Sequence, residues 1–383
     1  MPSDRPRRKL VRRIAAGLSL LLLVLVGTAY GAYRYYDSKV TRIALPSLHK
    51  GTTVTTGSYF LLAGSDTREL SDGAQFQASG ASAVTGQRAD TVILVHIPTG
   101  SAKVTLMSFP RDSYVQIPAF TDKAGVTTAA HAAHYAKLNE AFAIGGADLL
   151  VKTIEGLSGL PVDHYLQINF DGFRRIVDAV GGVTLCVGTT RSDKDSGDFL
   201  TAGTHPNVSG AEALAFVRDR KGLASGDLDR IADQQYFVSQ VLKKVLAAGT
   251  LANPVRLTSL LNATTESLTA DKRFGLSQLR TLASRLSNLD SSHVTFVTLP
   301  VLDAEGRRVI HGLRSDVVLL DQARLPAAFA AVEGKLTPTT QPSSPQPPAT
   351  QPPATAHSTA APSPTSPSPT VKATTAKATT CAV

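Results

Sequence analysis

About twenty consecutive uncharged and mostly apolar residues lie near the N-terminus, at positions 14–33. A helix of roughly that length crosses the hydrocarbon layer of a membrane. Six basic residues and one acidic residue precede the segment, within positions 1–13. Because positively charged flanks favour the cytoplasmic side, they orient the N-terminus inward. The sequence therefore predicts a transmembrane helix at 14–33 that holds the rest of the chain outside the cell membrane.

A cleaved signal peptide is the alternative reading of this segment, since it also begins with basic residues. Its apolar stretch would be shorter and would end in small residues at a cleavage site. Residues 28–32 offer only a poor site of that kind. Tyrosines at positions 30, 33, 35 and 36 suit the outer membrane interface, where aromatic side chains gather. These features favour a retained anchor.

The formal net charge of +9 is concentrated at the two ends of the chain. Positions 1–13 carry +5, and Lys372 and Lys377 carry +2, which leaves about +2 for everything between. A nucleic-acid-binding domain needs a broad basic surface. We therefore expect no nucleic acid among the partners of this protein.

Composition divides the chain into five segments. The cytoplasmic basic segment 1–13 and the apolar segment 14–33 are followed by a connector at 34–57 and a stretch of mixed composition at 58–335. From 336 to 383 the chain is rich in Pro, Thr, Ser and Ala, with too little apolar material to offset the entropy of ordering. We predict one folded extracytoplasmic domain at 58–335 and a disordered tail at 336–383.

Short strand patterns alternate with helical patterns inside the stretch 58–335. Patterns typical of strands lie at 58–62, 91–97, 103–108, 164–168, 183–187 and 293–299. Apolar residues recur every three to four positions at 137–159, 171–180, 210–220, 228–248, 254–268 and 276–286. Because strands and helices interleave, we predict an α/β fold, a single three-layer α/β/α domain whose central sheet is covered on both faces.

The only two cysteines are too few for a disulfide framework. Cys186 lies in an apolar run and Cys381 lies almost at the C-terminus. We expect a buried thiol and a tail thiol, with a long-range bridge between them as the alternative.

Two histidines, His131 and His134, lie in an Ala-rich segment. A spacing of three could suit a metal ion on a helix. No third ligand lies near them in the sequence, so we expect both to be solvent-facing loop residues.

Two carboxylates lie where predicted strands begin or end. Asp66 follows the run 58–62 just after Gly64, and Asp90 precedes the run 91–97. Ligand sites in open sheets gather at strand ends, and hard divalent cations prefer carboxylate oxygens. Asp66 and Asp90 are therefore candidate metal ligands, although an Asp after a strand is more often a cap or turn residue.

Arginines gather at the same kind of position. A guanidinium group offers a planar set of donors that suits phosphate, and a helix start adds unpaired N–H groups. The alternative is a set of solvated charges or ion-pair partners of nearby Asp residues, and spacing alone leaves both open. The candidates are Arg88, Arg111, Arg218, Arg220 and Arg230, with Asp227 near a predicted helix start and Gln234 one turn after Arg230.

Seven segments of the chain resemble the LytR-CpsA-Psr family of bacterial envelope phosphotransferases. They are LLAGSDTR (61–68), RADTVILVHI (88–97), SFPRDS (108–113), KLNEAFAIGG (137–146), DHYLQINFDGF (163–173), GGV (181–183) and GAEALAFVRDR through GDLDRIADQQ (210–235). They cover about 180 residues in the family's order. The resemblance implies a central mixed sheet with flanking helices.

The resemblance also implies roles for individual residues. Asp66 and Asp90 resemble the carboxylates that hold Mg²⁺, with Mn²⁺ as the alternative ion, and Asp227 lies where the family keeps another acid. Asp229 stands where the family frequently has glycine, so its role is open. The residues that resemble those around the carrier's diphosphate are Arg88, Arg111, Arg218, Arg220, Arg230 and Gln234. The implied catalytic set is Asp90, Arg111, Arg218, Arg220 and Asp227.

The activity implied by the resemblance is transfer of a cell-wall glycopolymer phosphate from a polyprenyl diphosphate carrier to peptidoglycan, at a muramic acid hydroxyl. The expected partners are the lipid-linked glycopolymer, peptidoglycan and the membrane. Phosphoryl transfer needs positioning and charge neutralisation more than covalent protein chemistry, and Asp90 or Asp227 would take the acceptor proton. Two alternatives stay open: a polyprenyl diphosphate hydrolase, and a non-catalytic protein that binds the carrier or the wall.

Overall fold

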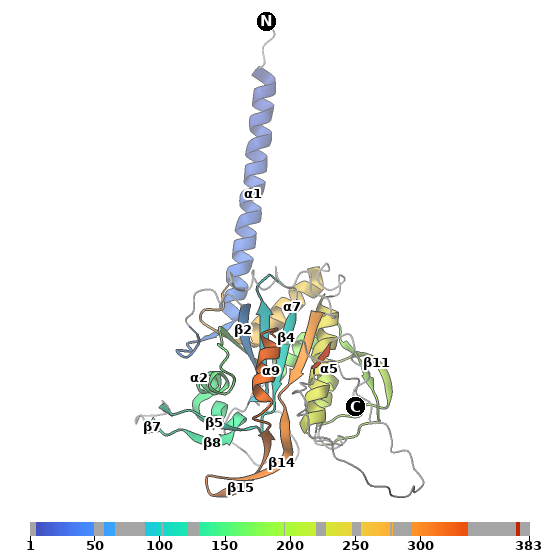
Figure 1. Ribbon diagram of the computed structural model, residues 1–383. Coiled ribbons are helices and arrows are strands. Elements are labelled where there is room, and N and C mark those ends of the chain that lie inside the picture. Colours follow the sequence, from blue (N-terminus) through green and yellow to red (C-terminus); the bar gives the residue numbers. More distant parts are fainter. Residues whose placement is uncertain are drawn as a thin grey trace, which may run out of the picture.

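The computed structural model in Figure 1 shows a long N-terminal helix that projects from a folded α/β domain. It describes residues 5–49, 57–65, 89–100, 103–121, 130–194, 196–219, 227–246, 254–275, 278, 293–335 and 373–375. Helix α1 runs from Arg5 to Lys39 without interruption. Its segment Leu18–Lys39 is long and apolar enough to cross a membrane, and none of it is buried against the domain. One such helix is compatible with a single-pass membrane protein.

Helix α1 is joined to the domain at its C-terminal end. The ammonium group of Lys39 lies 2.5 Å from the carboxylate of Glu266 on α7, and the guanidinium group of Arg42 lies 2.7 Å from the carboxylate of Asp37. These contacts fix the direction in which the helix leaves the domain.

A central mixed sheet forms the middle layer of the domain. In the described part of the chain it has eight strands, in the order β1-β12-β9-β2-β3-β4-β13-β16. The pairs β1–β12, β2–β9 and β4–β13 are parallel, and the other neighbours are antiparallel. The bounds are β1 Thr41–Ile43, β2 Gly57–Ser65, β3 Ala89–Pro98, β4 Val104–Phe109, β9 His164–Asn169, β12 Leu268–Asp271, β13 Val294–Thr298 and β16 Ala373–Thr375.

The two outermost strands depart from the predicted segment boundaries. Strand β1 lies in the stretch 34–57 that the sequence suggested was only a connector, yet it pairs with β12. Strand β16 lies in the tail predicted to be disordered, yet it pairs with β13. Both are three-residue strands, too short to show a recognisable alternation of apolar and polar residues. The sheet therefore recruits chain from beyond 58–335.

Helices cover both faces of this sheet, as the predicted three-layer fold requires. Side chains alternate across a strand, so Tyr59 and Leu61 of β2 point to the face packed by α2 and α9. Phe60 points to the opposite face, where Val238 of α5 packs. The helices are α2 Leu138–Ser158, α3 Phe170–Ala179, α4 Gly210–Arg218, α5 Asp227–Leu246, α7 Pro254–Ser267 and α9 Leu325–Val332.

Most predicted elements are present, although not all belong to the central sheet. The predicted strand at 183–187 is β10 (Val183–Val187), but within the described residues it pairs with β11 (Gly203–Val208) and not with the central sheet, and it packs with α3, α4 and α5. The predicted helix at 276–286 lies outside the described residues apart from position 278. The other small pairings are β5 Tyr114–Ile117 with β8 His134–Lys137, β6 Phe120–Thr121 with β7 Ala130–His131, and β14 Val301–Ile310 with β15 Leu313–Leu320.

The cysteines differ from the favoured expectation. Cys186 on β10 is disulfide-bonded, and the structure contains no free cysteine in the part it describes. The other cysteine of the sequence, Cys381, lies outside the described residues. The expectation of a buried thiol at position 186 was therefore wrong, because sequence position gives no information about long-range pairing.

Candidate active site

A β-bulge positions Asp90 where β2 ends and β3 begins. Gly64 pairs with Thr91 and Ser65 pairs with Ala89, so Asp90 is the additional residue between two paired positions. Such an insertion redirects a side chain and is frequent beside active sites. Ser65 is fully buried and immediately precedes Asp66, which lies outside the described residues. The strand ends that carry the two predicted metal ligands therefore lie side by side.

Arg111 connects Asp90 to a second carboxylate. Its guanidinium group donates a short hydrogen bond to the carboxylate of Asp90 and another, of 3.2 Å, from Nε to Asp112. The ammonium group of Lys137 lies 3.2 Å from the other oxygen of Asp112. Acids and bases thus alternate along Asp90, Arg111, Asp112 and Lys137. Two carboxylates fix the plane of the Arg111 guanidinium group before any ligand binds.

The electrostatic environment of Asp112 follows from these neighbours. Burial of its carboxyl group opposes ionisation, but the positive charges of Arg111 and Lys137 outweigh that effect and hold the pKa of Asp112 below its usual value. Asp112 is therefore ionised at neutral pH and anchors both cations. Sequence analysis gave Lys137 no role, although it begins the matched segment 137–146.

Backbone hydrogen bonds hold the segment that carries Arg111. The first N–H groups of a helix have no partner inside the helix, and two of those in α2 bind this segment instead. The N–H of Leu138 donates to the carbonyl of Ser113, and the N–H of Asn139 donates to the carbonyl of Arg111, each at 2.9 Å. On the other side, the N–H of Val318 on β15 donates to the carbonyl of Asp112 at 2.9 Å. The position of Arg111 is thus set by α2 and β15 as well as by β4.

The described part of the predicted metal site fits a hard divalent cation. The carboxylate of Asp90 is 28% exposed, and Nη1 of Arg111 contacts its Oδ1 atom. Mg²⁺ and Mn²⁺ take carboxylate oxygens and complete their shell with water or phosphate oxygens. Asp90 therefore fits as one ligand of such an ion.

A second set of predicted site residues comes from α4 and α5. A capping box at Ser209 and Glu212 starts α4, and Arg218 ends it. The guanidinium group of Arg218 lies over the ring of Phe170, 5.0 Å from its centroid. On α5, the amide of Gln234 donates to the carbonyl of Val217 at 3.4 Å. Gln234 therefore contacts the backbone of the residue that precedes Arg218.

Gln235 connects the site residues on α4 and α5 to the strand that leads to Arg111. Its side-chain amide, which is buried, donates to the hydroxyl of Ser108 at 3.1 Å and to that of Thr298 at 2.9 Å. Ser108 lies on β4, three positions before Arg111, so the turn of α5 with Gln234 and Gln235 lies against the strand end from which the Arg111 segment departs. Side chains of both sets are therefore carried by elements that touch. The sequence analysis missed Gln235, although it ends the matched segment 210–235.

The structure describes the remaining predicted site residues to different extents. Arg230 is buried on α5, with 5% of its surface exposed. Asp227 begins α5, but its side chain is outside the described part, and Arg88 and Arg220 lie outside it altogether. Asp229, whose role the sequence left open, is half-buried on the first turn of α5. The roles assigned to Arg88, Arg220, Asp227 and Arg230 thus remain predictions, and the role of Asp229 stays open.

Next to these residues lies a buried network of charged side chains. The sequence did not reveal it. The Nη2 atom of Arg191 is 2.7 Å from the carboxylate of Asp233, and Nη1 is 3.7 Å from that of Asp219. The guanidinium group also lies 4.6 Å from the centroid of the Phe216 ring. Asp219 follows Arg218 and Asp233 precedes Gln234, so this network supports the segments that carry the predicted site residues.

Two acids of the network have raised pKa values. Burial, together with the charge of Asp219, raises the pKa of Asp198 to about 6. Burial raises the pKa of Asp233 to about 7, because the charges of Asp229 and Asp219 add to it and Arg191 only partly offsets them. Each carboxyl group is 1% exposed. The network therefore changes its charge near neutral pH.

Replacing Asp233 with asparagine should flatten the pH dependence of stability. A carboxyl group whose folded pKa is raised from 3.8 to about 7 favours the folded state below the lower value and loses that contribution as pH rises through the higher one. The parent should lose roughly 2–3 kcal/mol more free energy of unfolding than Asp233→Asn between pH 5 and pH 8. Chemical denaturation at both pH values measures this difference. Parallel losses in the two proteins would contradict it.

The profile of the LytR_cpsA_psr family matches residues 35–324, which is most of the chain. The chain belongs to this family. The match includes β1 and ends just before α9, so it covers every described strand of the central sheet except β16. The resemblance predicted from seven short segments is confirmed.

Curated members of the LytR-CpsA-Psr family support this assignment. The chain is 29% identical over 359 residues to the cell wall biosynthesis protein LcpA of Corynebacterium glutamicum, a match covering 87% of this chain and 67% of LcpA. It is 29% identical over 254 residues to the polyisoprenyl-teichoic acid–peptidoglycan teichoic acid transferase TagV of Bacillus subtilis, covering 64% of this chain and 60% of TagV. The chain thus spans about two thirds of the length of these relatives.

Solved structures of family members share the fold. A LytR-Csp2A-Psr enzyme from Actinomyces oris matches with a TM-score of 0.56 and 23% identity, over 77% of this chain and 96% of that one. TagT bound to LI-WTA matches with a TM-score of 0.53 and 24% identity, over 77% of this chain and 99% of that one. The likeness confirms the predicted α/β fold with a central mixed sheet.

Proposed function

We propose that this protein is a membrane-anchored phosphotransferase that attaches a cell-wall glycopolymer, delivered on a polyprenyl diphosphate carrier, to peptidoglycan. The observation that carries the proposal is the alternation of charges along Asp90, Arg111, Asp112 and Lys137 at the end of the central sheet. Family membership gives the reaction class, since relatives such as TagV are named teichoic acid transferases. The acceptor is a hydroxyl group of muramic acid.

Charge neutralisation is the task that the described residues can perform. A diphosphate group carries several negative charges, and its cleavage leaves further charge on the departing prenyl phosphate. Arg111 is held by two carboxylates in a fixed plane, and Arg218 is supported by the ring of Phe170. Preorganised donors of this kind need little rearrangement when charge develops. In this proposal Arg111 and Arg218 bind the diphosphate from two sides, with Arg88, Arg220, Arg230 and Gln234 completing the set.

Asp66 and Asp90 would hold a magnesium or manganese ion. Bound there, the ion would supply further neutralisation of the diphosphate oxygens. Asp90 or Asp227 would accept the proton of the attacking hydroxyl group.

The membrane anchor places the active site beside the substrate. The apolar part of α1 continues directly into the domain at Lys39, and the basic residues at its start orient the N-terminus toward the cytoplasm. The domain is then extracytoplasmic, close to the outer leaflet. A polyprenyl carrier remains in the membrane, so an enzyme acting on its diphosphate benefits from being held at that surface.

Transfer should require both the acceptor and Arg218. Full-length protein in detergent, given a lipid-linked glycopolymer, peptidoglycan fragments and Mg²⁺, should form a joined product that mass spectrometry detects. In Arg218→Ala the rate of its formation should fall by roughly 10²-fold, because one positioned donor to the diphosphate is lost. Arg307→Ala is the matched control, since Arg307 is 78% exposed on the β14–β15 hairpin.

The outcomes separate the proposal from its alternatives. Release of prenyl phosphate without a joined product, at the same rate with and without acceptor, identifies a hydrolase. Binding of the carrier with no turnover identifies a non-catalytic protein. Equal transfer by Arg218→Ala and Arg307→Ala would remove Arg218 from the site.

A further inference from the structure

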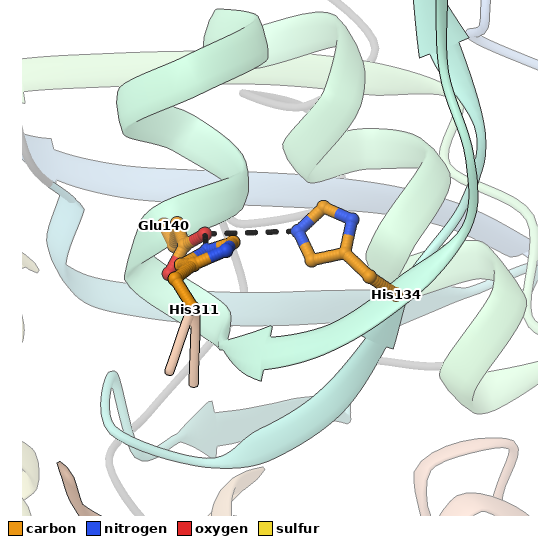
Figure 2. A group of neighbouring side chains, drawn as sticks. All are labelled: His134, Glu140 and His311. Atoms are coloured by element: carbon orange, nitrogen blue, oxygen red, sulfur yellow. Dashed lines mark hydrogen bonds and ion pairs between the residues drawn. The ribbon is translucent and has the colours of Figure 1, made fainter. Parts of the chain in front are cut away.

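Three potential metal ligands from different parts of the fold meet away from the Asp90 carboxylate. His134 begins β8, Glu140 lies in the first turn of α2, and His311 lies at the tip of the hairpin between β14 and β15. Figure 2 shows both imidazole rings directed at the carboxylate of Glu140. The sequence analysis expected His134 to face solvent because it found no third ligand nearby. In the folded protein His311, which lies 171 positions after Glu140 in the sequence, contacts the Glu140 carboxylate.

The ligand atoms lie close to the spacing of a metal site. Nε2 of His311 is 2.6 Å from Oε1 of Glu140, and Nε2 of His134 is 3.6 Å from the same oxygen. One ligand atom from each residue lies within 4.8 Å of the other two. Ligands bound tetrahedrally to zinc at about 2.0–2.1 Å are roughly 3.3 Å apart. Small rotations of these side chains therefore suffice to enclose an ion.

The ring of His134 is oriented as a metal ligand would be. Its Nδ1 atom lies 3.2 Å from the carbonyl oxygen of Ala132. A carbonyl oxygen can only accept, so Nδ1 carries a proton, and in the neutral imidazole Nε2 then carries the lone pair. Nε2 is buried and has no hydrogen-bond partner among the described residues. A hydrogen bond from the other ring nitrogen to a backbone carbonyl is the usual support for a metal-binding histidine, and the buried lone pair is otherwise unexplained.

His311 occupies a backbone position with positive φ, which few residues other than glycine adopt. Its φ is 50°, and Gly312 follows with φ 80°, so both central residues of the hairpin turn have positive φ. Asn-Gly is the ordinary choice for such a turn, and histidine is one of the few other residues that adopt a left-handed backbone conformation with some frequency. Here the side chain points back from the hairpin tip to Glu140.

We propose that His134, Glu140 and His311 form a binding site for a divalent transition-metal ion, with zinc as the best fit. Two imidazoles and one carboxylate select zinc over magnesium, and they leave a fourth position for water. The bound ion would fasten the β14–β15 hairpin tip to the start of α2. Because Asn139 of that same helical turn donates to the carbonyl of Arg111, the ion also steadies the segment that carries Arg111. The proposal does not depend on the transfer activity.

Zinc binding to the untagged, metal-free full-length protein in detergent tests this site. Isothermal titration calorimetry should show one strongly bound Zn²⁺ per chain that excess Mg²⁺ does not displace. His311→Asn should bind zinc at least about tenfold more weakly, since even loss of a supporting residue costs about 10- to 100-fold. Asparagine suits the positive φ of the turn, so this variant should keep its fold, which circular dichroism in EDTA would verify.

Two further variants keep the test decisive. Glu140→Gln retains a hydrogen-bond acceptor for His311 but loses the anionic ligand, so it should also bind zinc at least about tenfold more weakly. His131→Ala should bind as the parent does, because His131 stacks on the ring of Phe120, 4.5 Å between centroids, outside the cluster. Absence of zinc binding in the parent would overturn the proposal. So would unchanged affinity in both His311→Asn and Glu140→Gln, or weakening by His131→Ala equal to theirs.

Discussion

Replacing Arg111 with alanine should lower kcat/KM for glycopolymer transfer by roughly 10²- to 10³-fold, the effect of removing one preorganised donor at a site of developing charge. Arg111 is the residue through which Asp90 and Asp112 are connected. Its loss removes a positive charge that would bind the diphosphate. It also leaves the carboxylates of Asp90 and Asp112 without the cation that lies between them, so they repel each other. Steady-state kinetics with a lipid-linked donor and a peptidoglycan acceptor measure the change.

Arg111→Lys separates charge from geometry. Lysine keeps the positive charge but cannot reach two carboxylates with a planar set of donors, so it should recover only a small part of the lost rate. Thermal unfolding of each variant shows whether the fold is intact. Transfer by Arg111→Ala at the rate of the exposed control Arg307→Ala would exclude Arg111 from the chemistry.

Replacing Arg191 with methionine should produce the largest loss of stability, and the loss should depend on pH. Removing one member of a buried ion pair costs roughly 3–5 kcal/mol when the partner remains charged. The pKa of Asp233 is raised to about 7, and without Arg191 it should rise further. At pH 8 the full loss is expected, while at pH 5 Asp233 binds a proton and most of the loss disappears. Chemical denaturation at the two pH values measures it.

The exposed pair Arg307–Asp316 provides the contrast for this experiment. Its side chains are 78% and 83% exposed, and solvent screens such pairs, so Arg307→Met should change the free energy of unfolding by less than about 1 kcal/mol at either pH. A loss in Arg191→Met that is the same at pH 5 and pH 8 would contradict the assignment of the titration to Asp233.

Strong periodicity made most of the fold predictable. The apolar run at 58–62 predicted a strand, and the structure packs α2 on one face of it and α5 on the other. Apolar residues at helical spacing likewise located α2, α3, α4, α5 and α7. In each case the burial pattern repeats often enough along the chain to be recognised without its partners.

Elements with little or no internal pattern were missed. The β14–β15 hairpin carries charged and exposed residues such as Arg307 and Asp316, and β1 has only three residues. Strand β10 was predicted, but its partner β11 was not, because that strand is mostly exposed. The order of strands in the sheet depends on which surfaces complement one another, and no single segment contains that information.

The candidate site, like the fold, was predictable only in part from the sequence. The motifs that contain Asp90, Arg111, Arg218 and Gln234 were recognisable as residue types at element ends, and the structure connects them through contacts among β4, α4 and α5. Lys137 and Gln235 lay inside the same motifs without being noticed. Arg191 could not be associated with Asp233 at all, because 42 positions separate them and neither follows a recognisable pattern.

The apolar N-terminal helix, the alternation of strands and helices, and the family of the chain are all expressed in residues that are neighbours in the sequence, so they could be predicted without coordinates. Folding is needed to hold Arg111 between two carboxylates, to bury Arg191 among acids, and to bring His134 and His311 together at Glu140. Contacts of that kind depend on the distance between atoms after folding, which separation along the chain does not specify.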